Sequence, residues 1–224
     1  LKDFNLELEP NKKIAIVGSS GQGKSTLFNL ITRIFEPNKG EIDIDGINIK
    51  DLTEEDLRKN ISIIRQEPFV FNRTIKENFK IINDNITLSK IRECTKLDYL
   101  DDYIMSLPKK YDTVLGEGGV NLSGGQKQRL SIARTLSKGS KIILFDEATS
   151  ALDNKSQEYI KKTIDNLVKN HTIVIVAHRL STIIDAVIIF VVDNGKVVSS
   201  GTHNELLKTS DIYKNLYETE SLNS

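Results

Sequence analysis

Five short runs of apolar residues recur along the chain, separated by polar segments and turn residues. The runs are continuous rather than alternating, which is typical of strands covered on both faces, as in a parallel sheet between helices. The segment from Ser156 to Lys169 has helical periodicity instead and places Ile160, Ile164 and Leu167 on one face. The pattern predicts an α/β fold with a parallel core. The predicted strands are Ile14–Val17, Ile61–Ile64, Ile142–Phe145, Ile173–Val176 and Val187–Val192.

Antiparallel additions to this core are predicted by two pairs of turn residues. Asp45-Gly46 separates the β-rich segments 41–44 and 47–49, and Asn194-Gly195 separates 187–192 from 196–199. A further strand is expected at Phe4–Leu8. Because the first residue is Leu1 rather than Met, we expect the chain to be a domain excised from a longer protein.

The character of the sequence changes between the second and third predicted strands, where no apolar run of strand type appears. Thr74 and Glu77 have the spacing of a capping box that opens a helix, and residues 89–97 and 99–105 have helical patterns. We therefore expect one domain, residues 1–224, with a core lobe of about 1–71 and 140–224 and a helical subdomain of about 72–139.

The composition of the chain limits which classes of function are plausible. The chain of 224 residues carries 31 basic and 31 acidic side chains, so its zero net charge provides no electrostatic footprint for nucleic acid. The single cysteine, Cys94, excludes an internal disulfide and fits a reducing compartment. The apolar runs are far shorter than the roughly 18 residues needed to cross a bilayer. A membrane part, if the parent has one, lies outside this sequence.

A glycine-rich segment follows the first predicted strand and fits the phosphate-loop pattern G-x-x-x-x-G-K-[ST]. Backbone N–H groups of such a loop point inward and, with the helix that follows, bind phosphates. Lys24 is placed to reach the β- and γ-phosphates, Ser25 to bind Mg²⁺, and Thr26 to lie near the α-phosphate. The alternative is a βα turn that binds nothing. The loop residues are Gly18, Ser19, Ser20, Gly21, Gln22, Gly23, Lys24 and Ser25.

The predicted strand 142–145 ends in Asp146 and Glu147, which places both carboxylates at the edge where open α/β sheets bind ligands. Alone, Asp146 is more typical of a helix N-cap. Beside a phosphate loop, it is a candidate Mg²⁺ ligand, and Glu147 is a candidate base for the water that attacks the γ-phosphate.

The segment Leu122-Ser123-Gly124-Gly125-Gln126 precedes a predicted helix and adds a second set of backbone donors. A capped turn is the simpler interpretation. The order of phosphate loop, pentapeptide and Asp-Glu strand end, however, resembles the nucleotide-binding domain of ABC exporters over almost the whole chain. This resemblance implies a P-loop NTPase fold with a RecA-like core, an antiparallel β arm and a helical insertion.

The resemblance assigns roles that the residues alone leave open. It implies that Gln66 reaches the metal and the attacking water, and that His178 contacts the γ-phosphate; without it, both are ordinary polar residues. It implies that Ser123, Gly124, Gly125 and Gln126 act on ATP held by a second, head-to-tail subunit. It places Asp153 near the other subunit's phosphate loop.

Three segments resemble exporters in particular: 66–78, 113–119 and 201–203. The resemblance implies ATP hydrolysis that powers transmembrane export, transmembrane domains as partners, and a position at the cytoplasmic face of a membrane. In exporters, the resemblance implies, residues 66–78 and 113–119 flank a groove that receives the membrane domain, although Phe69 and Phe71 also fit ordinary core packing. The aromatic residue that stacks on adenine in exporters has no counterpart within the seventeen residues before Gly18.

Two other functions remain to be distinguished. A soluble ABC ATPase acting on ribosomes or DNA would be indicated by tandem cassettes, basic arms or coiled coils, none of which the sequence contains. A nucleotide-binding regulator without turnover would be indicated by loss of Glu147 or His178, and both residues are present.

Overall fold

A six-stranded sheet forms the centre of the computed structural model, which describes residues 1–222 except 20, 117–118, 150–151 and 178. The strand order is β4-β5-β6-β1-β7-β8, with β8 antiparallel and the others parallel. All five predicted strands are confirmed to within about two residues. The bounds of the six strands are β1 Lys13–Val17, β4 Ile61–Ile64, β5 Ile142–Asp146, β6 Thr172–Val176, β7 Ile188–Asp193 and β8 Lys196–Gly201.

The two predicted hairpins both form, but only one joins the main sheet. Strands β7 and β8 meet across Asn194-Gly195, whereas β2 (Asp43–Ile44) and β3 (Ile47–Asn48) make a separate two-stranded sheet. All four turn residues have positive φ, between 49° and 76°, as the turn that matches strand twist requires.

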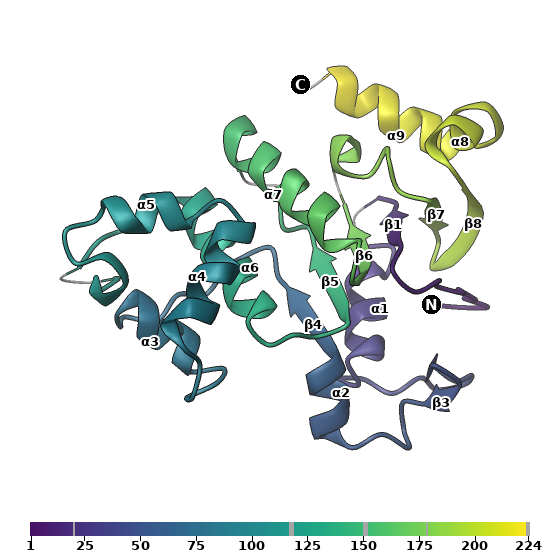
Figure 1. The fold of residues 1–224 in the computed structure, drawn as a ribbon. Helices are drawn as coiled ribbons and strands as arrows, with labels where there is room; N and C mark the ends of the chain where they lie inside the picture. Colours follow the sequence, from purple (N-terminus) through teal and green to yellow (C-terminus); the bar gives the residue numbers. More distant parts are fainter. Residues whose placement is uncertain (20, 117–118, 150–151, 178, 223–224) are drawn as a thin grey trace.

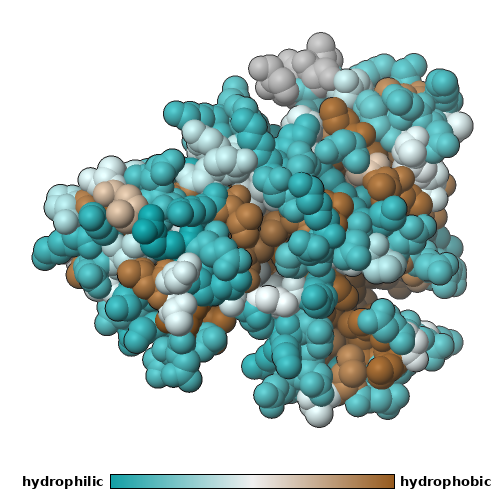
Figure 2. Space-filling model, in the orientation of Figure 1, coloured by the Kyte–Doolittle hydropathy of each residue, from teal (hydrophilic) through white to brown (hydrophobic). Residues whose placement is uncertain are grey.

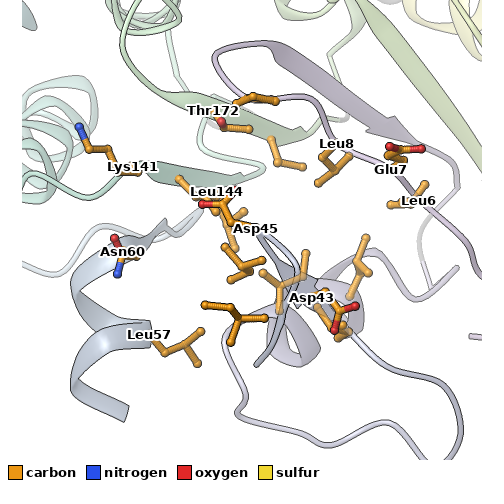
Figure 3. Close-up of a pocket in the computed structure, with 18 of the residues that line it drawn as sticks. Leu6, Glu7, Leu8, Asp43, Asp45, Leu57, Asn60, Lys141, Leu144 and Thr172 are labelled. Carbon is orange, nitrogen blue, oxygen red and sulfur yellow. The ribbon is translucent and has the colours of Figure 1, made fainter. Parts of the chain in front are cut away.

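The strand expected at Phe4–Leu8 is wrong, since this described segment is assigned no strand. Phe4, Leu6 and Leu8 instead pack on the apolar core. They lie across a cavity of about 1170 Å³ from the β2–β3 hairpin and the sheet, with Asp43, Leu57 and Leu144 among the labelled lining residues in Figure 3. A strand needs a neighbouring strand to which its backbone can hydrogen-bond. This segment faces a cavity instead.

Helices cover both faces of the sheet, which explains the continuous apolar runs (Figure 1). Along β1, Ala15 and Val17 belong to one core cluster and Ile16 belongs to the other. The helices of the sheet lobe are α1 Lys24–Ile31, α2 Glu54–Asn60, α7 Asn154–Leu167, α8 His203–Thr209 and α9 Asp211–Leu222, with a short 3₁₀ turn, η2, at Leu180–Thr182.

A second group of helices lies to one side of the sheet and comes from the chain between β4 and β5 (Figure 1). The capping box predicted at Thr74 and Glu77 forms with both of its hydrogen bonds and opens the first of them. None of the helices in the described ranges is long and apolar enough to cross a bilayer. This group comprises α3 Ile75–Lys80, α4 Leu88–Leu97, α5 Asp101–Ser106, η1 Lys110–Asp112 and α6 Gly124–Leu136.

Candidate active site

The register of the parallel strands brings the predicted site segments to one edge of the sheet. Val176 is level with Ile16 of β1 and with Asp146 of β5, and Ile64 of β4 is level with Phe145. The phosphate loop, Asp146-Glu147 and Gln66 therefore all follow neighbouring strand ends. Position 178 follows the same edge in sequence, but His178 and Ser20 lie outside the described residues.

The phosphate loop leaves β1 in a conformation that requires glycine at its first position. Gly18 has φ of 155°, and a Cβ there would lie 2.2 Å from the carbonyl oxygen of Val192. The loop ends at Gly23, the N-cap of α1, so the first N–H groups of that helix are directed toward the loop.

The side chain of Lys24 is buried and hydrogen-bonds to the backbone of the phosphate loop. Its Nζ donates hydrogen bonds to the carbonyl oxygens of Gly18 (2.5 Å) and Ser19 (2.7 Å), and the residue is only 5% exposed. Burial lowers the pKa of Lys24, while Glu147 and Asp146 act in the opposite direction. A buried ammonium beside two carboxylates is thus positioned at the strand ends.

Asp146 is half-buried, and its pKa is raised above the usual range, first by burial and then by the neighbouring Glu147. Arg65, Lys24 and the hydroxyl of Ser25 partly offset this shift. Among the described residues, no group of three or more His, Cys, Asp or Glu side chains is arranged so that it could hold a metal ion. One carboxylate with an adjacent hydroxyl nevertheless fits Mg²⁺, which proteins commonly bind through one or two carboxylates together with substrate phosphates.

Glu147 follows directly with a strained backbone. Its φ is 51°, in the left-handed region, while its N–H still donates to the carbonyl oxygen of Val176 at 2.9 Å. Non-glycine residues in this region cost about 1–3 kcal/mol and cluster at functional sites. Strand β5 ends at Asp146, directly before this turn.

The pentapeptide Leu122–Gln126 begins α6 in the second group of helices. Ser123 is the N-cap: its Oγ accepts from the N–H of Gln126, whose Oε1 accepts from the N–H of Ser123. Ser123 and Gly124 are exposed, whereas Gly125 is buried. The pentapeptide is thus a capped turn in its local structure, and it presents a hydroxyl and backbone donors to the surface.

Gly125 brings the start of α6 against the start of α7. A Cβ at Gly125 would lie 2.0 Å from Oγ of Ser156 and 3.6 Å from Oδ2 of Asp153. Asp153 caps α7 by accepting from the N–H and the hydroxyl of Ser156, which lowers the pKa of its carboxyl. The pentapeptide and Asp153 are therefore neighbours within one chain.

Two buried polar residues of α6, Gln128 and Arg129, form hydrogen bonds to backbone segments outside this helix. Neither residue was identified from the sequence. Gln128 is fully buried, and its Nε2 donates to the carbonyl oxygen of Arg65, next to Gln66. Arg129 donates to the carbonyl oxygen of Tyr99 at 2.8 Å and lies over the ring of Tyr159 in α7. The available signal was helical spacing: Gln128 lies four positions before the buried Ile132, and Arg129 lies four positions before the buried Ala133, which places both polar residues on the inward face of α6.

A groove of about 570 Å³ lies between the end of α1, α2, β4 and the end of α6. Ile34 and Ile82 line it and are 55% and 38% exposed. Figure 2 shows the surface hollowed between the α3–α6 group and the α2 end of the sheet lobe. Phe69 is 66% exposed and contacts Phe71 edge to face, so it is not an ordinary core residue.

Comparison with known proteins identifies the family. The sequence model of the ABC transporter family matches residues 1–150. Two Staphylococcus aureus proteins (strains NCTC 8325 / PS 47 and COL), each named as a multidrug export ATP-binding/permease protein, are 47% identical over 222 residues, covering 99% of this chain and 38% of theirs. The solved structure of a bacterial Atm1-family ABC exporter with ATP bound superimposes with a TM-score of 0.90 at 39% identity, covering 97% of this chain and 38% of that one.

The chain thus spans 38% of the length of the curated relatives it matches. The fold, the order of the motifs and the similarity over nearly the whole chain agree with one another. The chain belongs to the ABC transporter family and matches part of the length of the exporter proteins in it.

Proposed function

We propose that this domain hydrolyses ATP at the sheet edge to power export by transmembrane domains. The observation that carries the proposal is the register that brings the ends of β1, β5 and β6 together, with Lys24 buried beside Asp146 and Glu147. The other ABC function considered, a soluble ATPase acting on ribosomes or DNA, is not favoured, because the relatives are exporter proteins.

The phosphate loop and the start of α1 would bind the phosphates through three kinds of group: backbone N–H groups, a hydroxyl and the ammonium of Lys24. Backbone N–H groups and the start of α1 would bind the phosphate oxygens, and Thr26 would add a hydroxyl. Lys24 would exchange its loop carbonyls for the β- and γ-phosphates. The backbone-binding positions are Gly18, Ser19, Ser20, Gly21, Gln22 and Gly23.

Asp146, Ser25 and Gln66 would hold Mg²⁺, which supplies charge neutralisation at the phosphates. Glu147 would orient and polarise the attacking water, and the left-handed backbone at this residue supports the assignment. His178 would donate to the γ-phosphate. Residues after β1 would therefore bind the phosphates, while Glu147, after β5, would orient the attacking water and accept its proton.

Ser123, Gly124, Gly125 and Gln126 would act on a nucleotide held by a second copy or by a related partner. The exposure of Ser123 and Gly124 supports this, because a donor set acting in trans must lie on the surface. A two-fold, head-to-tail dimer would complete two sites. Asp153 would lie at the same interface, since it neighbours Gly125.

The division into a core lobe (about 1–71 and 140–224) and a helical subdomain (about 72–139) is part of the proposal. The groove lined by Ile34 and Ile82 lies between these parts and, with exposed Phe69, suits contact with a transmembrane domain. The domain would then act at the cytoplasmic face of a membrane.

Hydrolysis and binding measured together test the proposed site. Glu147→Gln is expected to bind ATP with wild-type affinity but to lose turnover, whereas Lys24→Ala is expected to lose affinity. Turnover of Glu147→Gln within a few-fold of wild type excludes Glu147 as the base.

A further inference from the structure

Helix α6 packs beside β4 and hydrogen-bonds to both ends of the segment 65–69 that follows this strand (Figure 1). At the start of the segment, Nε2 of Gln128 donates to the carbonyl oxygen of Arg65 at 3.1 Å. At its end, Nη2 of Arg134 donates to the carbonyl oxygen of Phe69 at 2.8 Å. We call Gln128 and Arg134 the clasp. Gln66 lies between the two bonds that the clasp makes.

The backbone between these two bonds has little freedom. Gln66, Glu67 and Pro68 are the three residues that separate the bonded positions. Proline fixes its own φ and restricts the residue before it, so Glu67 and Pro68 have few conformations. Just beyond the segment, the fully buried Asn78 of α3 accepts from the N–H of Phe71 at 2.9 Å and donates to its carbonyl oxygen at 3.1 Å. The backbone of Gln66 is therefore held between fixed points.

Both clasp residues leave a second polar atom unpaired inside the protein. Oε1 of Gln128 and Nη1 of Arg134 are buried and have no hydrogen-bond partner among the described residues. A buried polar atom without a partner lowers stability, and an apolar side chain at the same position would avoid that loss. A carbonyl oxygen can only accept, so the two ends of the segment need N–H donors. The polar side chains of the clasp therefore suit a hold on the segment better than packing of α6.

The clasped segment begins beside a proposed Mg²⁺ ligand. Strands β4 and β5 are parallel, and Ile64 is level with Phe145. The residues that come next, Arg65 and Asp146, therefore follow at the same edge of the sheet. Under the proposed function, Gln66 binds Mg²⁺ together with Asp146, so its position relative to this edge matters for hydrolysis.

We propose that Gln128 and Arg134 are positioning residues for hydrolysis: they hold the backbone of Gln66 so that its side chain meets the metal and the attacking water. The inference rests on the proposed role of Gln66. The phosphate loop follows a different strand, β1, and has its own contacts with Lys24. Loss of the clasp is therefore expected to lower kcat and to leave the Kd for ATP in Mg²⁺-free buffer unchanged.

The test measures hydrolysis at saturating ATP and Mg²⁺, Mg²⁺-free ATP binding and thermal unfolding for variants of the 224-residue chain. Protein concentrations are those at which specific activity no longer rises. Gln128→Met and Arg134→Met remove the donors with little change in volume, whereas Arg134→Lys keeps a charged donor. Gln66→Ala and the double variant Gln66→Ala/Gln128→Met complete the set.

Ser140→Ala is the matched control. The hydroxyl of Ser140 is 2.7 Å from that of Ser62 in β4, and both residues are buried. This variant therefore also removes a buried hydrogen bond to β4, but three residues before Arg65 and away from Gln66.

We expect Gln128→Met and Arg134→Met each to lower kcat by about three- to tenfold, the size of effect of one hydrogen bond. Arg134→Lys is expected to keep most of kcat, and Ser140→Ala to match wild type. Added to Gln66→Ala, the Gln128→Met change is expected to cause no further loss, because both act through Gln66.

The outcomes separate this inference from the proposed role of Gln66. A wild-type kcat for Gln66→Ala contradicts that role, and the inference with it. A low kcat for Gln66→Ala beside a wild-type kcat for either Met variant overturns the inference alone. If Gln128→Met does not fold, Arg134→Met and Arg134→Lys decide the same question through the other bond.

Three further results would overturn the inference. A full further loss in the double variant would mean that Gln128 acts by a route other than Gln66. A loss in Ser140→Ala as large as that in Gln128→Met would mean that any weakened attachment of β4 lowers kcat. A raised Kd for ATP in Mg²⁺-free buffer would mean that the Met variants damage the phosphate loop.

Discussion

The contact between α6 and α7 at Gly125 makes a prediction that depends only on geometry. Gly125→Ala would place a Cβ 2.0 Å from Oγ and 2.6 Å from Cβ of Ser156, distances at which atoms must move apart. Gly124→Ala is the matched control, because its Cβ would meet the Cδ2 of Leu152 at 3.8 Å, an ordinary contact. Both glycines lie in the first turn of the same helix.

The difference between the two variants isolates the cost of the clash. Overpacking of a tight contact costs about 1–3 kcal/mol, and the gain in helix propensity from glycine to alanine, up to about 1 kcal/mol, is common to both. For a domain of this size, 1 kcal/mol corresponds to roughly 2–4 °C in Tm. We expect Gly125→Ala to unfold about 2–12 °C below Gly124→Ala.

Differential scanning calorimetry without nucleotide measures this difference before any question of catalysis arises. Ser156→Gly removes both crowding atoms, and in the Gly125→Ala background it is expected to recover part of the lost Tm despite the cost of glycine in a helix. Equal Tm values for Gly125→Ala and Gly124→Ala would refute the close packing of the two helix starts.

Three further predictions concern the sheet edge. Glu147→Gln should lower steady-state ATP hydrolysis by about 10²–10⁴-fold, as loss of a general base does, and should accumulate an ATP-bound dimer detectable by size exclusion. Lys24→Ala should raise the Kd for ATP in a direct binding titration, whereas an unchanged Kd would contradict its contact with phosphate. Asp146→Asn should raise the Tm at pH 7 in Mg²⁺-free buffer: the raised pKa of Asp146 means that stability is lost as pH rises from the unfolded value through the folded one, and the amide avoids this loss. A lower Tm for this variant would contradict the burial of its charge.

The sheet could be predicted because burial on both faces imposes a local signal, the continuous apolar run. Phe4–Leu8 carries a different strand signal, alternating apolar and polar residues, but forms no strand, since a strand also requires a neighbour, and that neighbour cannot be identified from the segment alone. Val187 was likewise assigned to a strand, yet it is 47% exposed and precedes β7.

The site was predictable to the extent that its motifs are local. The phosphate loop, the capped start of α6 and the end of β5 each lie within a few residues, so spacing is enough to identify them. The contact of Gly125 with Ser156 and that of Leu180 with Glu220 join distant segments, the second across 40 residues. Such contacts follow from how α7 and α9 pack, and no periodicity in the sequence encodes them.

The central claim, that one copy's phosphate loop works with another copy's Ser123 segment, is tested most directly by mixing two inactive variants. Lys24→Ala and Ser123→Arg should each be nearly inactive alone. In a mixed dimer acting in trans, the intact loop of one subunit meets the intact segment of the other, so one of two sites is restored. An equal mixture should recover up to about a quarter of wild-type hydrolysis, because half of the dimers are mixed. A mixture no more active than its two components would contradict the claim.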